Sequence, residues 1–518
     1  MKRTAGERFF YVADRLRKQE NVFYHLSYLL GEVLHIAGSY VPYQVVYAFL
    51  WWARGFLTFL LVRRFLPKNL LIAYTAGALV LVHSADGATQ WVGQMNQYGV
   101  IFWMLMAFLF LTIALDTRWY FSIPLAALAA GFEYMSLWSY ESEILLIVVF
   151  PLILVLHPGR RWRKLIPLSI AWFVVPYIYI RLTIERYSAS GQHTYQQTVA
   201  RKTWDVASIL SDWVFNVSFS LEFWKWIRGP WRYSVFAAVA LAVLAAAVFV
   251  GGALRVSRTR SVVAKLASAQ SWHQAAWLLS CGMGLLILSF PVFLVLDSAR
   301  GLWRTQFLSG IGAAVVFAAL IWLIAAAVPQ RWKSPVFLFL GATVVFVGSL
   351  SAIQKGGEHR WIWERHRAAI RQVLHVAPNV DPYTVIVLTN VPAGPNDPFG
   401  DDMWFDMALR LVYPGIRVSG IYFHTDGSRP PGDNFVVKGD QWVSDGTGFP
   451  PLIQSTPISD TVVIRYDPSG HGVLEKTMPH YVCAPDCSRA ELYHPEEVIF
   501  GPISPRAVRR YNLPPEDR

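Results

Sequence analysis

Three carboxylates stand in short polar segments between long apolar stretches of the chain: Asp86, Glu141 and Glu143. Ionisable side chains next to segments that enter lipid are costly to maintain, so they are functional candidates. A carboxylate in such a place can act as a general base toward a hydroxyl group, or as a ligand of a divalent metal ion. We assign either role to Asp86, with Glu141 and Glu143 as supporting acids.

Two arginines, Arg300 and Arg304, precede a later apolar stretch, and a third, Arg54, lies inside one. A guanidinium group binds phosphate oxygens in a bidentate manner, so these cations could hold a phosphate leaving group while a carboxylate acts as base. A plainer interpretation competes for each residue. Loop carboxylates then solvate helix ends, and the arginines of residues 297–307 extend to lipid headgroups.

The composition indicates a membrane protein. Hydrophobic residues make up 54% of the 518 residues and charged residues only 15%, and the mean hydropathy is +0.35. A soluble chain would carry about 25% charged residues. The net charge of +12 comes mostly from Lys and Arg in short loops, as in signals of membrane orientation, so we exclude nucleic acid as a partner.

Ten apolar runs approach the ~20 residues that cross a bilayer, and each must be helical there because lipid offers no hydrogen-bond partners. These runs lie at residues 41–62, 70–85, 98–115, 121–138, 142–156, 165–183, 233–254, 274–296, 308–328 and 335–352. The sequence therefore predicts a multi-pass helical domain over residues 41–352.

The short loops alternate between basic and non-basic. Basic residues gather in five of them, at 63–68, 118, 160–164, 255–265 and 331–333. The positive-inside rule places these loops in the cytoplasm. The loop 184–232 and the tail 353–518 then lie outside a plasma or inner membrane.

The N-terminal residues 1–40 fit this orientation poorly, because residues 1–20 carry six Lys and Arg yet precede a run that starts outside. Three interpretations stay open. Residues 22–38 form a poor crossing helix, an upstream helix precedes this chain, or residues 8–36 form an amphipathic helix in the interface. In the outer loop, residues 199–228 are also predicted to lie in the interface.

The sequence pattern of the tail, residues 353–518, predicts a small α/β domain. Residues 358–374 and 402–412 read as helices, whereas residues 384–388 and 416–423 read as strands. This strand–helix–strand order is typical of α/β folds. Further strands are predicted at 435–438 and 461–466.

Two cysteines of this tail, Cys483 and Cys487, would meet an oxidising environment outside the cell, which favours a local disulfide. With His480 and His494 they also form a four-ligand set that could hold zinc, although the spacing fits no standard zinc finger.

Residues 40–330 resemble, in order and spacing, the GT-C superfamily of membrane glycosyltransferases, and most of all the branch of protein O-mannosyltransferases. In residues 82–105, His83 is followed by an acid, then by Trp91 and by Gly93 to Asn96. The family has a His-Pro turn, an acid, a Trp and a Gly-Arg-x-Asp there. The resemblance implies substrate-binding roles for His83, Trp91 and Asn96.

Two later segments carry the same resemblance. Residues 136–151 are similar to the family segment that begins Ser-Lys-Glu, with Glu141 as the acid, and residues 300–320 to a segment in which an Arg precedes a Gly-containing helix. Members transfer a sugar from a polyprenyl-phosphate donor at the outer face of a membrane, often with a divalent metal ion. The resemblance implies that Arg300 and Arg304 hold the donor phosphate.

The chain departs from the family pattern at several positions. The Pro after the His is Ser84, and the Gly-Arg-x-Asp becomes Gly-Gln-Met-Asn, ending at Asn96. The family's usual catalytic acid follows a first helix, and this chain begins after both. The match therefore implies a relative that lacks the first helix and first outer loop, or a non-catalytic one, with Asp86 as the remaining acid. A lipid or solute transporter and a membrane-anchored binding protein are the alternatives.

Overall fold

A computed structural model describes residues 22–36, 40–87, 95–156, 162–189, 204–258, 269–295, 305–400, 402–413, 415–430, 435–444, 455–484, 486–511 and 513. The chain divides into two compact units, Met1–Glu358 and His359–Arg518. The first is helical and the second mixes helices and strands.

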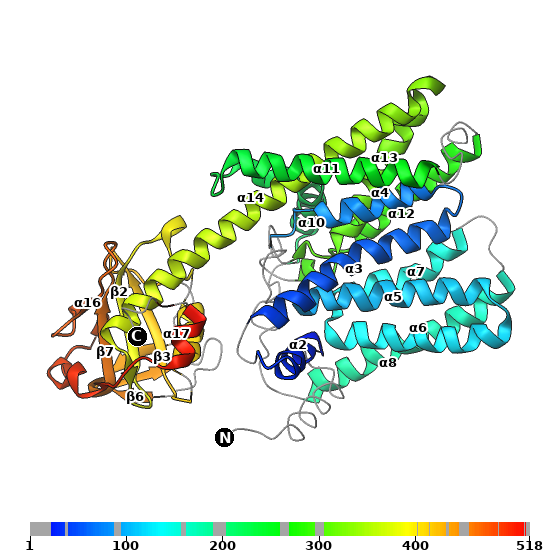
Figure 1. Cartoon of the computed structure of the whole chain (residues 1–518). Coiled ribbons are helices and arrows are strands. Elements are labelled where there is room, and N and C mark those ends of the chain that lie inside the picture. The colour runs from blue at the N-terminus through cyan, green and yellow to red at the C-terminus, as the bar shows by residue number, and fades with distance from the viewer. Residues whose placement is uncertain are drawn as a thin grey trace. The chain divides into compact units, whose positions relative to one another are not determined.

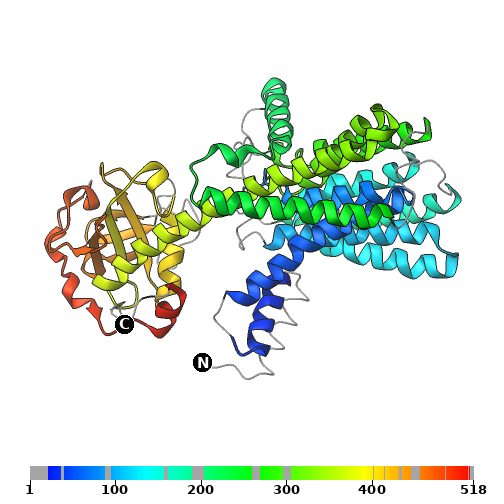
Figure 2. The ribbon, with the colours of Figure 1, turned by 45° about the horizontal axis from the view of Figure 1, so that its top comes forward.

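Each of the ten predicted apolar runs coincides with a helix of the first unit. These helices are α3 (Val41–Phe65), α4 (Leu70–Val82), α5 (Met95–Asp116), α6 (Trp119–Ser139), α7 (Ile144–Leu156), α8 (Trp162–Ala189), α11 (Val235–Arg258), α12 (Ala269–Leu288), α13 (Ser309–Ala327) and α14 (Lys333–Val376). Figures 1 and 2 show most of these helices aligned along a shared direction. Two shorter helices, α2 (Val22–Val33) and α10 (Val206–Leu221), complete the unit.

Among the described residues, seven helices are long and apolar enough to cross a membrane, and α4, α7 and α10 are shorter apolar helices. The protein is therefore a multi-pass helical membrane protein. The predicted helix at 358–374 is not a separate element, because it forms the second part of α14.

Close helix contacts are made possible by glycine. A Cβ atom on Gly55 of α3 would lie 2.8 Å from the carbonyl oxygen of Gly77 on α4, and the reverse distance is also 2.8 Å. The helices α12 and α13 meet in the same way, since a Cβ on Gly312 would lie 2.5 Å from the backbone nitrogen of Leu286. Small residues at helix contacts are the usual way in which membrane helices pack.

The second unit is built on a four-stranded sheet in the order β3-β2-β7-β8. Its strands are β2 (Val385–Val391), β3 (Ser419–His424), β7 (Thr461–Arg465) and β8 (Val473–Leu474). The strand β2 pairs in parallel with both β3 and β7, while β8 is antiparallel. The helix α15 (Asp402–Val412) connects β2 to β3.

A three-stranded antiparallel sheet, β4 (Phe435–Lys438), β5 (Gln441–Ser444) and β6 (Ser455–Pro457), completes the main strand structure. A two-stranded sheet pairs β1 (Asn379–Val380) with β9 (Ile499–Phe500). The short helices α16 (His480–Cys483) and α17 (Pro505–Tyr511) lie in the last forty residues. This arrangement is a small α/β domain.

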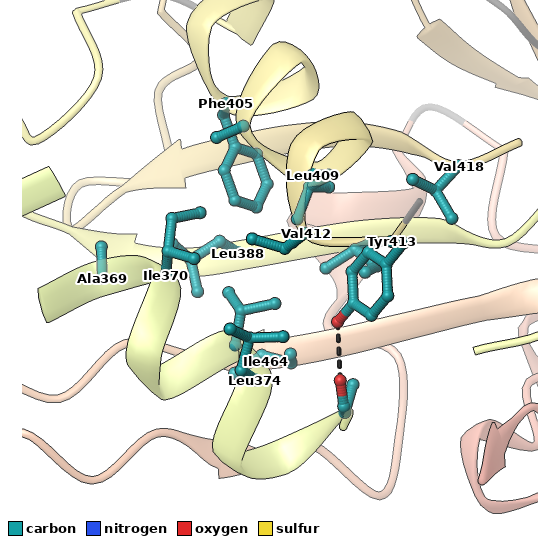
Figure 3. Close-up of a cluster of buried hydrophobic side chains, with 14 of the residues drawn as sticks. Ala369, Ile370, Leu374, Leu388, Phe405, Leu409, Val412, Tyr413, Val418 and Ile464 are labelled. Carbon is teal, nitrogen blue, oxygen red and sulfur yellow. Dashed lines mark hydrogen bonds between the residues drawn. The ribbon is translucent and has the colours of Figure 1, made fainter. Parts of the chain in front are cut away.

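The alternating side chains of the parallel strands bury two cores. On one face, residues of α14 and α15 pack on Leu388 and Ile464, as Figure 3 shows, and the Tyr413 hydroxyl donates a hydrogen bond to the Ala377 carbonyl oxygen over 2.6 Å. On the other face, Val387 and Val463 contact a core that includes Trp442. Burial on both faces explains why the central strands are nearly all apolar.

Candidate functional site

The carboxylate of Asp86 lies in an extended segment directly after α4 and is only 1% exposed. The hydroxyl of Tyr98, in the first turn of α5, donates a hydrogen bond to Asp86 Oδ2 over 2.9 Å. Arg54 of α3 lies 3.4 Å from the same hydroxyl oxygen and donates a second hydrogen bond to the carbonyl oxygen of Val80 over 2.8 Å. The three side chains form a buried chain from a guanidinium group to a carboxylate.

The close contact of α3 and α4 positions this chain. Gly55 lets α3 approach α4, so the neighbouring Arg54 reaches Val80 without leaving the protein interior. The guanidinium carbon also lies 4.9 Å from the centre of the Tyr98 ring, and the Tyr47 ring lies 5.1 Å from the Tyr98 ring. As an arginine inside an apolar run requires, Arg54 faces protein and is 1% exposed.

The two residues that start this extended segment connect it to other helices. His83 Nε2 lies 2.8 Å from the carbonyl oxygen of Ser220, at the end of α10. Ser84 donates to the carbonyl oxygen of Phe223 over 2.6 Å and lies 2.7 Å from the hydroxyl of Ser351 on α14. Ser84 thus connects the segment after α4 to Phe223, two residues past α10, and to α14.

The helix α10 turns its polar face toward this network. Gln306, just before α13, donates to Asn216 Oδ1 over 3.1 Å, and Ser220 donates to Gln306 and lies 2.8 Å from Ser309. Asn216 and Ser220 are buried, whereas Val214 on the same helix is 68% exposed. The helix expected within residues 199–228 is the shorter α10, and its polar side packs against protein. Its place in the membrane interface stays a prediction.

Two lysines flank one indole ring beside Asp86. Trp226 donates from its Nε1 to the carbonyl oxygen of Ser84 over 2.6 Å. Lys355 Nζ lies 3.5 Å from the centre of its ring and Lys225 Nζ lies 5.5 Å from it. Lys355 Nζ lies 3.8 Å from Glu358 Oε2, and Asp86 is a second acid that acts on it electrostatically. Burial lowers the pKa of Lys225, and the nearby Glu222 partly opposes that shift.

Glu143 is buried at the start of α7, where it accepts hydrogen bonds from Ser136 over 2.7 Å and from Ser142 over 3.4 Å. The Ser136 hydroxyl also lies 3.3 Å from the carbonyl oxygen of Val100, two residues beyond Tyr98. Glu143 therefore packs against the same end of α5 as Asp86. The backbone of Glu141 belongs to the short helix η2 (Glu141–Glu143), and its side chain lies outside the described atoms.

Of the other predicted site residues, the structure describes one and leaves three outside the described ranges. Asn96 is half-buried in the first turn of α5, next to the Asp86 segment. Trp91, Arg300 and Arg304 lie outside the described residues. The described chain resumes at Thr305, which is buried.

An apolar pocket lies deeper along the same helices. It is lined by side chains of α3, α5, α7, α12 and α13, among them Thr58, Leu146 and Ile311. Thr58 stands one turn from Arg54 and donates to its carbonyl oxygen over 2.8 Å, while Ile311 is two residues past Ser309. The apolar pocket is thus lined by residues that follow members of the polar cluster by about one helical turn or less.

Sequence reasoning missed the residues that hold Asp86 in place. Tyr98 and Lys355 stand in or beside apolar runs without a motif, and only their helical spacing relative to other polar residues could have indicated them. Glu133, in α6, was missed as well, and an acid inside an apolar run was the available signal. It is fully buried, and within the described part of the chain neither of its carboxylate oxygens has a hydrogen-bond partner.

The described residues do not supply a metal centre. Among them, no group of three or more His, Cys, Asp or Glu side chains could hold a metal ion. A divalent metal ion at Asp86 stays a prediction from the sequence. In the second unit, Cys483 and Cys487 form a disulfide instead of a zinc site with His480 and His494.

No family model and no curated protein matches this sequence. Two solved structures are similar to the chain, both of ArnT from Cupriavidus metallidurans, one bound to undecaprenyl phosphate and one in the apo state. Their sequences are 14% and 13% identical to this chain. The similarity covers 70% and 72% of this chain and 72% of each ArnT chain, with a TM-score of 0.33 for both. They are not structures of a protein O-mannosyltransferase, and a TM-score this low supports no functional argument.

Proposed function

We propose that this protein is a GT-C-type membrane glycosyltransferase that transfers a sugar from a polyprenyl-phosphate donor to an acceptor hydroxyl. One observation carries the proposal: a buried carboxylate, Asp86, is joined through Tyr98 to the cation Arg54, and an apolar pocket is lined by Thr58, one helical turn further along α3. A lipid-linked sugar phosphate has a matching order of groups: a polar sugar, a charged phosphate and a hydrocarbon chain.

Asp86 acts as the general base in this proposal. Tyr98 holds its Oδ2 atom, and Oδ1 takes the proton of the acceptor hydroxyl. The acceptor oxygen then bonds to the anomeric carbon of the sugar, while the bond between that carbon and the phosphate oxygen breaks. The acceptor proton ends on Asp86, and polyprenyl phosphate leaves with the bonding electron pair.

Lys355 and Lys225 are the cations that we assign to the leaving phosphate within the described chain. Both lie at the Trp226 ring, and Lys355 interacts with Asp86. A cation that faces the departing phosphate stabilises the charge that develops in the transition state. The predicted holders Arg300 and Arg304 precede the buried Thr305 in sequence and stay assigned to the same role.

The side of the membrane is part of the proposal. The alternating basic loops support an outer-face site, because the Asp86 and Glu143 segments both belong to the non-basic loops. The C-terminal domain would then also be extracytoplasmic. Cysteine-accessibility labelling of Asp440→Cys, at an exposed position of the C-terminal domain, tests this assignment in intact cells, and labelling only after cell lysis would overturn it.

A binding experiment tests the donor class. The purified full chain should gain thermal stability with undecaprenyl phosphate and much less with undecaprenol or with inorganic phosphate, since each offers only one half of the ligand. Lys355→Met should weaken the effect of undecaprenyl phosphate about tenfold or more in concentration, because it removes a charge-assisted contact. Lys333→Met, near the other end of the same span, is the matched control. Equal stabilisation by all three compounds would contradict the proposal.

A further inference from the structure

The second unit holds a separate buried carboxylate, Asp397, in the loop that follows β2. Its Oδ1 atom accepts hydrogen bonds from the backbone nitrogens of Phe399 and Gly400 over 2.8 and 3.0 Å. Its Oδ2 atom accepts one from the Tyr422 hydroxyl over 2.8 Å and lies 3.1 Å from His424 Nε2. Both oxygen atoms of this carboxylate are thus held by neighbouring groups of the loop and of β3.

The carboxylate sets the protonation of the histidine ring. Because Asp397 can only accept, His424 carries its hydrogen on Nε2, and Nδ1 is left as an acceptor. The hydroxyl oxygen of Ser428 lies 3.2 Å from that Nδ1 atom. The side chains of Asp397 and His424 are 9% and 11% exposed, whereas Ser428 is exposed. The series therefore runs from a buried acid to an accessible hydroxyl.

The sheet places this series where α/β domains bind ligands. Asp397 follows the carboxyl end of β2, and His424 is the last residue of the parallel strand β3. In open α/β sheets, sites form outside the carboxyl ends of the strands, next to a change in strand order. Here the change falls between β2 and β7, so the pair of Asp397 and His424, at the ends of β2 and β3, lies beside this point.

We infer that Ser428, His424 and Asp397 form a nucleophile–base–acid triad that cleaves small carboxylic esters, an activity separate from sugar transfer. The roles are those of a serine hydrolase with the two imidazole nitrogens exchanged. Ser428 Oγ attacks the ester carbonyl carbon and His424 Nδ1 takes its proton. The ester C–O bond then breaks, and the alcohol leaves with that proton. Water, deprotonated by the same nitrogen, releases the carboxylic acid and restores Ser428.

A local turn supplies the competing explanation and also an internal control. The Ser428 hydroxyl lies 2.6 Å from Asp426 Oδ1, within an Asp-x-Ser turn. The same turn recurs at Ser469 and at Ser488, each with a hydroxyl hydrogen bond to the aspartate two residues before it. Within the described chain, neither of these two serines hydrogen-bonds to a histidine. If the turn alone explains Ser428, all three serines will react alike.

A fluorophosphonate probe applied to the full-length protein separates the two explanations. The nucleophile forms an O–P bond and fluoride leaves, and the modified peptide is then identified by mass spectrometry. We expect the label on Ser428 and not on Ser469 or Ser488. His424→Gln should slow labelling by about 10²-fold or more, as the loss of a general base does. Asp397→Asn should also slow it, because the ring is no longer held in the required tautomer.

Ester turnover gives the second readout. With 4-nitrophenyl acetate, the full chain should release 4-nitrophenol in a reaction that Ser428→Ala abolishes and that Ser469→Ala leaves unchanged. Hydrogen exchange at β3 shows whether each variant retains the native sheet. Equal labelling of the three serines would overturn the triad, as would labelling or turnover that persists in a folded Ser428→Ala or His424→Gln variant.

Discussion

Each of the two units holds an aspartate side chain that is largely shielded from solvent and hydrogen-bonded to a tyrosine. The other groups around the two aspartates differ. In the helical unit, Asp86 accepts from Tyr98 over 2.9 Å, and the tyrosine is backed by Arg54. In the α/β unit, Asp397 accepts from a tyrosine over 2.8 Å, and its other partners are two backbone amides and His424. The first aspartate depends on side chains of other helices, and the second mostly on its own loop and the adjacent strand.

The groups around each aspartate differ because the helical unit and the α/β unit offer different hydrogen-bond donors. Asp86 lies between α4 and α5, and the permanent cation Arg54, joined to it through Tyr98, helps to compensate its charge. In the loop after β2, the backbone amides of Phe399 and Gly400 donate to Asp397, so this carboxylate is held without a permanently charged partner. Substitutions that remove matched groups from the two sites test this distinction.

Arg54→Met should have the largest effect. It removes a buried charge that is connected to Asp86 through Tyr98, and losing one partner of such a pair costs about 3–5 kcal/mol. The thermal midpoint of the full chain in detergent should fall accordingly. Arg118→Met, at an exposed arginine, is the control. Similar midpoints for both variants would show that Arg54 is not needed to compensate the carboxylate.

Gly312→Ala should destabilise the helical unit more than Gly420→Ala destabilises the α/β unit. The new Cβ on Gly312 meets backbone atoms of Leu286, which cannot move separately from α12, whereas that on Gly420 meets side-chain atoms of Leu409 and Phe405. We expect about 3 kcal/mol against about 1 kcal/mol in local opening free energy from hydrogen exchange. Gly131→Ala is the control, because nothing lies within 4 Å of its Cβ position. The reverse order would contradict the rigid contact of α12 with α13.

The same substitution in both sites gives a direct comparison. Tyr98→Phe removes the group that joins Arg54 to Asp86, and we expect a cost of about 2 kcal/mol. Tyr422→Phe removes one of four donors to Asp397, and about 1 kcal/mol is expected. Hydrogen exchange at the start of α5 and along β3 measures each cost. Equal costs would mean that both carboxylates are held in the same way.

The disulfide of the α/β unit should have the smallest effect. It closes a loop of only a few residues, so Cys483→Ser with Cys487→Ser should cost about 1 kcal/mol. In denaturant, the native chain should show one reactive thiol, that of Cys281, and three after reduction. Three thiols without reduction would place both cysteines in a reducing compartment, contrary to the proposed topology.

Much of the fold was predictable, because hydropathy and alternation act locally. The ten apolar runs each became a helix, and the predicted boundaries of α15 and β4 agree with the structure. The end of the last span was not predicted, because the apolar run 335–352 and the charged helix 358–374 read as separate elements, whereas α14 is continuous through both. The inner face of α10 could not be read either, because amphipathicity defines two faces without saying which one meets protein.

The candidate site was predicted only in part. The motif resemblance led to the segment of His83 and Asp86, which does join several helices. Tyr98 lies within the same segment without an assigned role, whereas Ser351 and Lys355 come from the distant helix α14. Which side chains meet across a bundle depends on helix rotation and on close contacts such as that of Gly55, and neither is encoded in a local pattern.

The most direct test of the proposed function is sugar transfer by Asp86→Asn. The purified chain, reconstituted in lipid, is given polyprenyl-phosphate sugars, and release of polyprenyl phosphate is measured alongside Glu141→Gln, Glu143→Gln and the control Asp116→Asn, an exposed aspartate paired with Arg64. Loss of the general base should lower kcat by about 10²–10⁴-fold in Asp86→Asn and leave Asp116→Asn unchanged. Transfer at the native rate by a folded Asp86→Asn variant would contradict the catalytic role of this carboxylate.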